Sequence, residues 1–199
     1  MKNATKHADT LKSVLRKLLK GQDVPELVTI DPLQALVRGC LSFDTTDSRA
    51  DEAMRTIAQE FVDLNELRVA TELEVVEIIG PRYPDIETRV GMFIQCLNGI
   101  FAREHSLSLE RLRTISRRDA RQFLRELPGI TPFVEAYTML YGLGASAFPA
   151  DETILSILKE EGVIEEDATA DETQRFVEHQ LKDDEPYKLF YCLRHRKKK

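Results

Sequence analysis

The chain has 199 residues, of which 42% are hydrophobic and 31% charged, and its formal net charge is −6. This composition is typical of a folded globular protein and excludes a disordered one, and no run approaches the roughly 20 apolar residues that cross a bilayer. Residues 1–13 carry lysines but no apolar run like that of a signal peptide, so we expect a cytoplasmic protein.

Hydrophobic residues recur at helical spacing along nearly the whole chain, and the alternation typical of strands is scarce. The pattern predicts an all-α protein. In chain order, helices are expected near residues 8–20, 32–42, 48–62, 71–79, 84–104, 107–113, 116–126, 132–143, 151–160, 171–182 and 185–195. Asp31-Pro32 and Thr131-Pro132 each place a potential N-cap before a proline, and Gly80-Pro81 marks a break.

Residues that could hold a metal are few and scattered. The three cysteines, Cys40, Cys96 and Cys192, lie far apart without C-x-x-C spacing, and the four histidines form no H-x-x-x-H pair. We therefore expect reduced thiols, no metal site, no iron–sulfur cluster and no other cofactor.

Charge is distributed in blocks along the chain. Segment 111–125 holds six arginines and a single acid, segment 151–186 holds thirteen acids and three basic residues, and segment 187–199 holds six basic residues and no acid. The basic blocks either present one face to DNA or solvate their helices and pair with the acidic block. An overall negative charge disfavours tight binding to a polyanion.

Segment 117–143 predicts two amphipathic helices joined by a tight turn. The first helix ends near Leu127, Pro128-Gly129 forms the turn, and the second helix begins at Pro132. Such a helix–hairpin–helix can point backbone N–H groups outward and bind a phosphate, assisted by the dipole of the second helix. An ordinary turn between two helices is the alternative.

Three further landmarks accompany this hairpin. Asp151, which opens another helix after a glycine- and proline-containing loop, lies 24 positions beyond Leu127, while residues 41–47 read LSFDTTD and residues 79–83 read IGPRY. In these respects residues 32–155 resemble the endonuclease III-like DNA glycosylases, with their hairpin-to-aspartate interval, their L-S-x-Q-x-T-D segment and their I-G-x-x segment. The four cysteines of that family's iron–sulfur cluster are absent.

The resemblance implies a two-lobed helical fold. Residues 25–145 would form a six-helix domain that ends in the helix–hairpin–helix, and residues 1–24 together with 146–199 would form the second lobe. It also implies that double-stranded DNA is a partner, bound without sequence preference. The candidate DNA contacts are Ser42, Asp44, Arg117, Arg118, Arg121, Pro128, Gly129, Ile130 and Thr131.

Asp151 is the candidate catalytic residue. Like the family's aspartate, it would stabilise the cationic sugar that forms as a base departs and would orient water. The alternative is an N-cap, and a buried, fully bonded Asp151 would favour capping alone. Phe133 stands where lyase-active members have their lysine nucleophile, so strand cleavage by that route is not expected. Phe133 and Tyr137 are candidates for a pocket around a flipped base, with packing in the core as their alternative.

Two positions depart from the family pattern. Thr131 replaces the second hairpin glycine and precedes Pro132, which has no N–H, so we expect an altered phosphate site, all the more because a β-branched residue disfavours positive φ. Asp44 replaces the glutamine that family members insert into the duplex, and an unpaired carboxylate there would repel phosphates.

The sequence therefore predicts a DNA repair protein of the endonuclease III-like type, acting as a monofunctional DNA N-glycosylase on a flipped damaged or mispaired base. Two alternatives stay open. One is a catalytically degenerate DNA-binding module on the same fold. The other is a protein-interaction module without DNA binding, which is favoured if the arginines of 111–125 and the basic residues of 187–199 fall on different faces or pair with the acids of 151–186.

Overall fold

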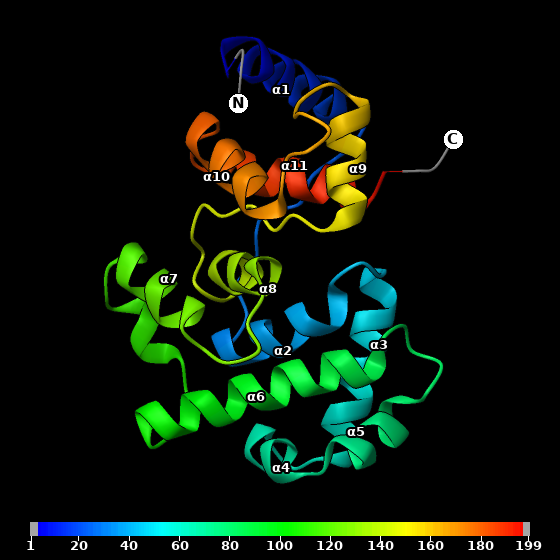
Figure 1. Cartoon of the computed structure of the whole chain (residues 1–199), viewed down its shortest axis with the longest axis vertical. Coiled ribbons are helices and arrows are strands. Elements are labelled where there is room, and N and C mark those ends of the chain that lie inside the picture. The colour runs from blue at the N-terminus through cyan, green and yellow to red at the C-terminus, as the bar shows by residue number, and fades with distance from the viewer. Residues whose placement is uncertain (1–3, 197–199) are drawn as a thin grey trace.

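The computed structural model describes residues 4–196, and within this range it contains helices, turns and loops but no strand (Figure 1). The predicted all-α class is confirmed. The helices are α1 (Ala4–Leu19), α2 (Pro32–Ser42), α3 (Asp47–Glu60), α4 (Leu64–Val69), α5 (Glu72–Ile79), α6 (Ile86–Glu104), η1 (Glu110–Arg113), α7 (Arg117–Arg125), α8 (Pro132–Tyr137), η2 (Thr138–Gly142), α9 (Glu152–Glu160), α10 (Ala170–Gln180) and α11 (Glu185–Arg194).

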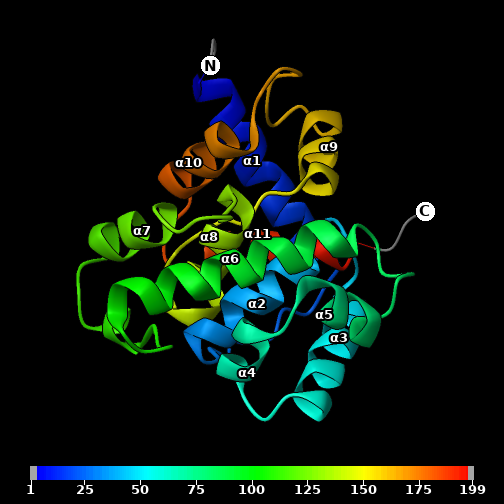
Figure 2. The same cartoon turned by 60° about the horizontal axis from the view of Figure 1, so that its bottom comes forward.

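The helices form two groups along the long axis of the molecule. Helices α1, α9, α10 and α11 lie together at one end, while α2 to α6 lie at the other, with α8 between the groups (Figure 1). Seen from the second direction, α6 runs across the molecule in front of α2 (Figure 2), and it packs on both α2 and α5. The first and last described helices therefore share one group, although the predicted boundaries at 24/25 and 145/146 stay a prediction.

Three local differences separate the observed helices from the expected ones. Helix α4 was not expected; Asp63 caps it by accepting the N–H groups of Asn65 and Glu66, both at 2.8 Å. No α-helix forms over 107–113, where only the single 3₁₀ turn η1 is found, and Ser108 Oγ accepts the Glu110 N–H before it. A serine that bonds a nearby N–H offers the backbone an alternative to an α-helix. The helix expected over 132–143 is divided into α8 and the π-helical turn η2.

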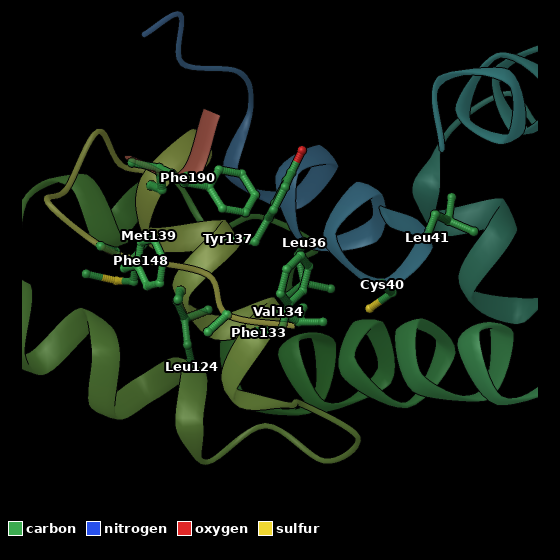
Figure 3. Packing of buried hydrophobic residues seen from close by; sticks show 14 of the residues in the cluster. Leu36, Cys40, Leu41, Leu124, Phe133, Val134, Tyr137, Met139, Phe148 and Phe190 are labelled. Atoms are coloured by element: carbon green, nitrogen blue, oxygen red, sulfur yellow. The ribbon is translucent and has the colours of Figure 1, made fainter. Parts of the chain in front are cut away.

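An aromatic cluster joins the two groups of helices. Phe133 and Tyr137 of α8 are buried, and the Phe133 ring centroid lies 5.7 Å from that of Tyr137 and 6.4 Å from that of Phe190 in α11 (Figure 3). Phe148, from the loop before α9, packs edge-on against Phe190. Burial of such rings removes a large apolar area from water, so this cluster holds α8 and α11 together.

Within residues 4–196, no helix is both long enough and apolar enough to cross a membrane.

Candidate active site and nucleic-acid interface

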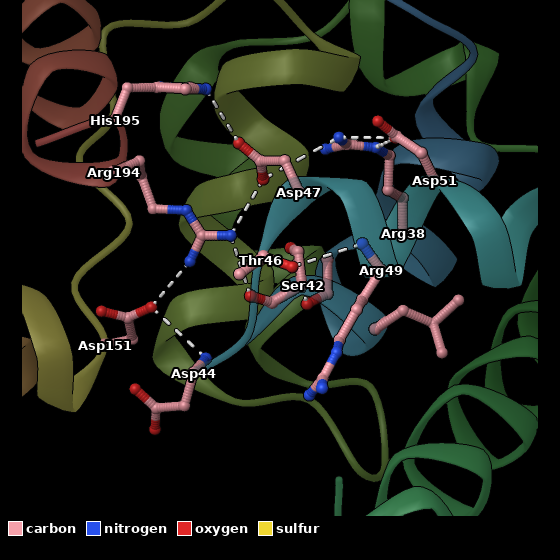
Figure 4. A network of polar contacts seen from close by, with 12 residues as sticks. Arg38, Ser42, Asp44, Thr46, Asp47, Arg49, Asp51, Asp151, Arg194 and His195 are labelled. Atoms are coloured by element: carbon pink, nitrogen blue, oxygen red, sulfur yellow. Dashed lines mark hydrogen bonds and ion pairs between the residues drawn. The ribbon is translucent and has the colours of Figure 1, made fainter. Parts of the chain in front are cut away.

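Asp151 lies directly before α9, at the level where the two groups of helices meet. Its backbone is extended, and its Oδ1 accepts the N–H of Ile154 at 2.9 Å, which is the geometry of a side-chain N-cap. The residue is 1% exposed. Its Oδ2 accepts the backbone N–H of Asp44 at 3.3 Å and the Nη1 of Arg194 at 2.9 Å (Figure 4). Both carboxylate oxygens are therefore bonded inside the protein.

Burial raises the pKa of Asp151, and the Ile154 N–H and the Arg194 guanidinium oppose that rise. The neighbouring Asp44 carboxylate adds to it. A carboxylate in this setting can still be ionised because a cation and two N–H groups face it. The same contacts leave no oxygen of Asp151 directed at an open site.

Arg194 is the residue at this centre that the sequence analysis did not single out. It lies in the last turn of α11, its side chain is only 7% exposed, and its Nη2 donates to Asp47 Oδ1 at 2.9 Å and to the carbonyl oxygen of Ser42 at 3.0 Å. Together with its bond to Asp151, these contacts tie α11 to α9 and to the turn between α2 and α3. In the sequence, Arg194 is only a basic residue at the end of a predicted helix. Such residues are too common to indicate that Asp151, 43 positions away, is its partner.

Asp47 extends this polar network toward the surface. Its carboxylate lies 3.9 Å from Arg38 Nη2 and 3.4 Å from His195 Nε2, and Arg38 pairs with Asp51 at 2.8 Å (Figure 4). Asp47, Asp51 and Asp151 thus alternate with the two arginines, Arg38 and Arg194. Such alternation of charge fixes side chains more effectively than a single exposed pair does.

Ser42, the last residue of α2, and Asp44, in the turn that follows, were expected to contact DNA. Ser42 is fully buried, and its Oγ donates to the carbonyl oxygen of Gly39 at 3.4 Å. Asp44 has a left-handed backbone with φ 45°, and its Oδ1 accepts the N–H of Thr153 at 3.3 Å. Both residues are bonded within the protein here, and the Asp44 carboxylate is directed at the start of α9.

The hairpin between α7 and α8 adopts a tight turn at Pro128-Gly129. Gly129 has φ 77°, and a Cβ atom there would lie 2.9 Å from the carbonyl oxygen of Met92, so only glycine fits without a shift. Thr131 has an extended backbone with φ −109°, and its hydroxyl accepts the N–H of Val134 at 3.3 Å. The expected difficulty of a β-branched residue at positive φ therefore does not arise at Thr131. Its hydroxyl caps α8.

A hollow of about 300 Å³ adjoins the hairpin, lined by Ile130, Thr131, Pro132, Arg125, Glu135 and Asp171. Glu135 is 1% exposed, with Arg121 Nε 2.8 Å from its Oε1 and Arg125 Nε 2.9 Å from its Oε2. Burial raises the pKa of Glu135, and the two guanidinium groups oppose that rise. A buried acid therefore takes up much of the positive charge next to the hairpin.

The arginines of 111–125 do not form one free basic face. Arg121 also makes a two-point contact with Glu178 of α10, at 2.6 and 3.0 Å, and Arg125 contacts Asp171 at 3.4 Å. Arg111 pairs with Glu104 and Arg113 with Glu110. Arg117 and Arg118 are exposed and form no ion pair with any residue in the range 4–196.

Phe133 and Tyr137, the candidate pocket residues, are 2% and 1% exposed and lie in the aromatic cluster. The Tyr137 hydroxyl finds no hydrogen-bond partner among the described residues. Neither of two surface hollows found in the described part of the chain is lined by Phe133, Tyr137 or Asp151. A base could therefore reach these buried side chains only after the packing around them changes.

All three cysteines are buried and free. Across residues 4–196, no cluster of three or more histidine, cysteine, aspartate or glutamate side chains is arranged to hold a metal.

Comparison with solved structures identifies the fold. The Clostridium acetobutylicum 8-oxoguanine glycosylase/lyase, solved with double-stranded DNA containing cytosine opposite 8-oxoG, is 16% identical with a TM-score of 0.74, over 98% of this chain and 70% of that one. A trapped endonuclease III–DNA covalent intermediate is 15% identical with a TM-score of 0.72, over 94% of this chain and 84% of that one. The H. pylori 3-methyladenine DNA glycosylase bound to 1,N6-ethenoadenine is 17% identical with a TM-score of 0.66, over 96% of this chain and 94% of that one.

No family model matches the sequence, and the search of curated proteins gave no match. The predicted endonuclease III-like helical fold is thus confirmed through structure.

Proposed function

We propose that this chain is a duplex-DNA-binding protein of the DNA repair type, in which Asp151 joins the two groups of helices and base excision does not take place. The observation that carries the proposal is the bonding of Asp151, whose two oxygens are bonded to Ile154, Asp44 and Arg194 at 1% exposure. The shared fold, whose solved relatives include complexes with double-stranded DNA, supports the DNA partner.

Excision chemistry makes demands that this arrangement opposes. A carboxylate that assists loss of a base must face the sugar, because it stabilises the positive charge that develops there. In this protein the guanidinium of Arg194 already supplies a positive charge at 2.9 Å from Asp151 Oδ2. The aromatic side chains that could stack on an extruded base, Phe133 and Tyr137, are packed in the core.

A second candidate is the monofunctional DNA N-glycosylase, which the position of Asp151 favours. Asp151 opens a helix 24 positions after Leu127, and burial raises its pKa, as is common for carboxylates that take part in chemistry. This function requires DNA binding to separate Arg194 from Asp151. With Phe133 in place of a lysine, it includes no lyase step.

One set of assays separates the two candidates. Wild-type protein, Asp151→Asn and Arg194→Gln are incubated with a panel of lesion-bearing duplexes, and abasic sites are revealed by hot alkali, while duplex binding is measured by fluorescence anisotropy. The proposal expects salt-dependent binding by all three proteins and release of no base. If wild type releases a base and Asp151→Asn does not, the protein is a glycosylase instead. Asp63→Asn, at another capping aspartate, is the matched control.

A further inference from the structure

A second hollow, of about 220 Å³, lies between α3 and the turn that joins α5 to α6. Arg49, Glu52 and Thr56 of α3 line one side, and Gly80, Arg82 and Tyr83 of the turn line the other. Gly80 has φ 105°, and nothing lies within 4 Å of the position that a Cβ atom would occupy, so the backbone borders open space there. The hollow is therefore a surface feature with two arginines at its wall.

These two arginines differ from most others in the protein. Arg49 and Arg82 are exposed, and neither forms an ion pair with a carboxylate in residues 4–196. In the same part of the chain, carboxylates neutralise Arg38, Arg103, Arg111, Arg113, Arg121, Arg125, Arg175, Arg194 and Arg196. The guanidinium of Arg49 also points away from the network around Asp47 (Figure 4). In a chain of net charge −6, such a free pair marks a local positive site.

We propose that this hollow binds a phosphate of the DNA backbone between Arg49 and Arg82. A guanidinium presents N–H groups in a planar fork that matches two phosphate oxygens. Glu52 is the one acid of the lining, so the two arginines leave the hollow with a net positive charge. The Tyr83 hydroxyl donates to the carbonyl oxygen of Leu41 at 2.6 Å, which fixes the ring as a wall of the hollow.

The inference rests on the proposed duplex binding and specifies where one phosphate lies. This contact is separate from any that the exposed Arg117 and Arg118 of α7 make, while Arg121 and Arg125 are held by Glu135, Glu178 and Asp171. The hollow adjoins the turn between α2 and α3 through the bond from Tyr83 to Leu41, so the duplex would lie along that side of the molecule.

The test measures affinity for an undamaged duplex against salt concentration for wild type, Arg49→Gln, Arg82→Gln and the double variant. Arg55→Gln is the matched control, because Arg55 is exposed on α3 but does not line the hollow. Each lining variant should weaken binding and reduce the slope of log K against log salt by about one, and the double variant by about two. Arg55→Gln should leave the slope closer to that of wild type. Inorganic phosphate is titrated separately, with the amide resonances of Gly80 and Arg82 as probes.

The outcomes are distinct. If wild type binds the duplex and the lining variants bind it with an unchanged slope, the inference is wrong and the proposed function stands. If wild type does not bind the duplex at any salt concentration, both are wrong. If the lining variants change only the binding of inorganic phosphate and not that of the duplex, the site binds a free anion, and the assignment to the DNA backbone is overturned.

Discussion

Asp44 and Asp151, 107 positions apart in the sequence, place their carboxylates on the first N–H groups of the same helix. Asp151 accepts from Ile154 and Asp44 accepts from Thr153, while the backbone N–H of Asp44 donates to Asp151. Two neighbouring negative charges are tolerated because Arg194 lies beside Asp151 and both carboxylates face the positive end of the α9 dipole. This relationship joins the turn between α2 and α3 to α9.

Replacing Asp151 should distinguish its capping role from its charge. Asp151→Ala removes the cap and leaves the Ile154 N–H unsatisfied, so we expect a loss of about 1–3 kcal/mol in the free energy of unfolding. Asp151→Asn keeps an oxygen for the Ile154 N–H, and Arg194 Nη2 keeps Asp47 and the Ser42 carbonyl, while Arg194 Nη1 and the Asp44 N–H lose their acceptor, so its loss should be smaller than that of Asp151→Ala. Chemical denaturation measures both. Equal losses in the two variants would contradict this account.

The raised pKa of Asp151 gives this residue a defined pH dependence. Its folded-state pKa lies above the ordinary value of 3.8, so between these two values the native state binds more protons than the unfolded state. The contribution of Asp151 to stability is therefore fully present below 3.8 and is lost as pH rises through the folded-state pKa. We expect wild type to gain stability relative to Asp151→Asn as pH falls from 7 toward 4. A difference that is constant over this range, measured by urea denaturation, would refute it.

Arg121 should contribute far more to stability than the exposed Arg117 on the same helix α7. Without Arg121, the buried Glu135 keeps only Arg125 as a cationic partner, and Glu178 loses its ion pair. Arg121→Gln should therefore lower the free energy of unfolding by about 3 kcal/mol. Arg117→Gln, at an exposed position on the same helix, should change stability by less than about 0.5 kcal/mol. Thermal and urea denaturation of the two variants provide the comparison. A small effect at both positions would mean that the network does not support the fold.

Wild-type protein should form no covalent complex with abasic DNA through the position after the hairpin. That step needs an amine to form a Schiff base, and Phe133 has none and is 2% exposed in the aromatic cluster. Incubation with an abasic duplex and sodium borohydride, followed by denaturing electrophoresis, should give no trapped species and no nicked strand. A trapped complex would reveal another nucleophilic amine.

The sequence by itself determined the features that depend on residues close together in the chain. Helical periodicity predicted the all-α class, Asp31 and Thr131 were recognisable as caps before prolines, and the interval from Leu127 to Asp151 predicted the fold that the solved structures share. Each of these signals lies within one continuous short stretch of the chain, so local patterns suffice to find them. Helix α4 was not predicted because its six residues are too few to show a clear helical periodicity.

Only the tertiary structure decided which charges meet. Arg194 reaches Asp151 across 43 positions and Arg121 reaches Glu178 across 57, and these contacts depend on how α11 and α10 pack on the rest of the protein. Sequence indicated a basic block over 111–125, yet packing neutralised Arg121 and Arg125 and left Arg49 and Arg82 without ion pairs within residues 4–196. The energy of an ion pair depends on distance and burial, and neither is encoded in the spacing of residues along the chain.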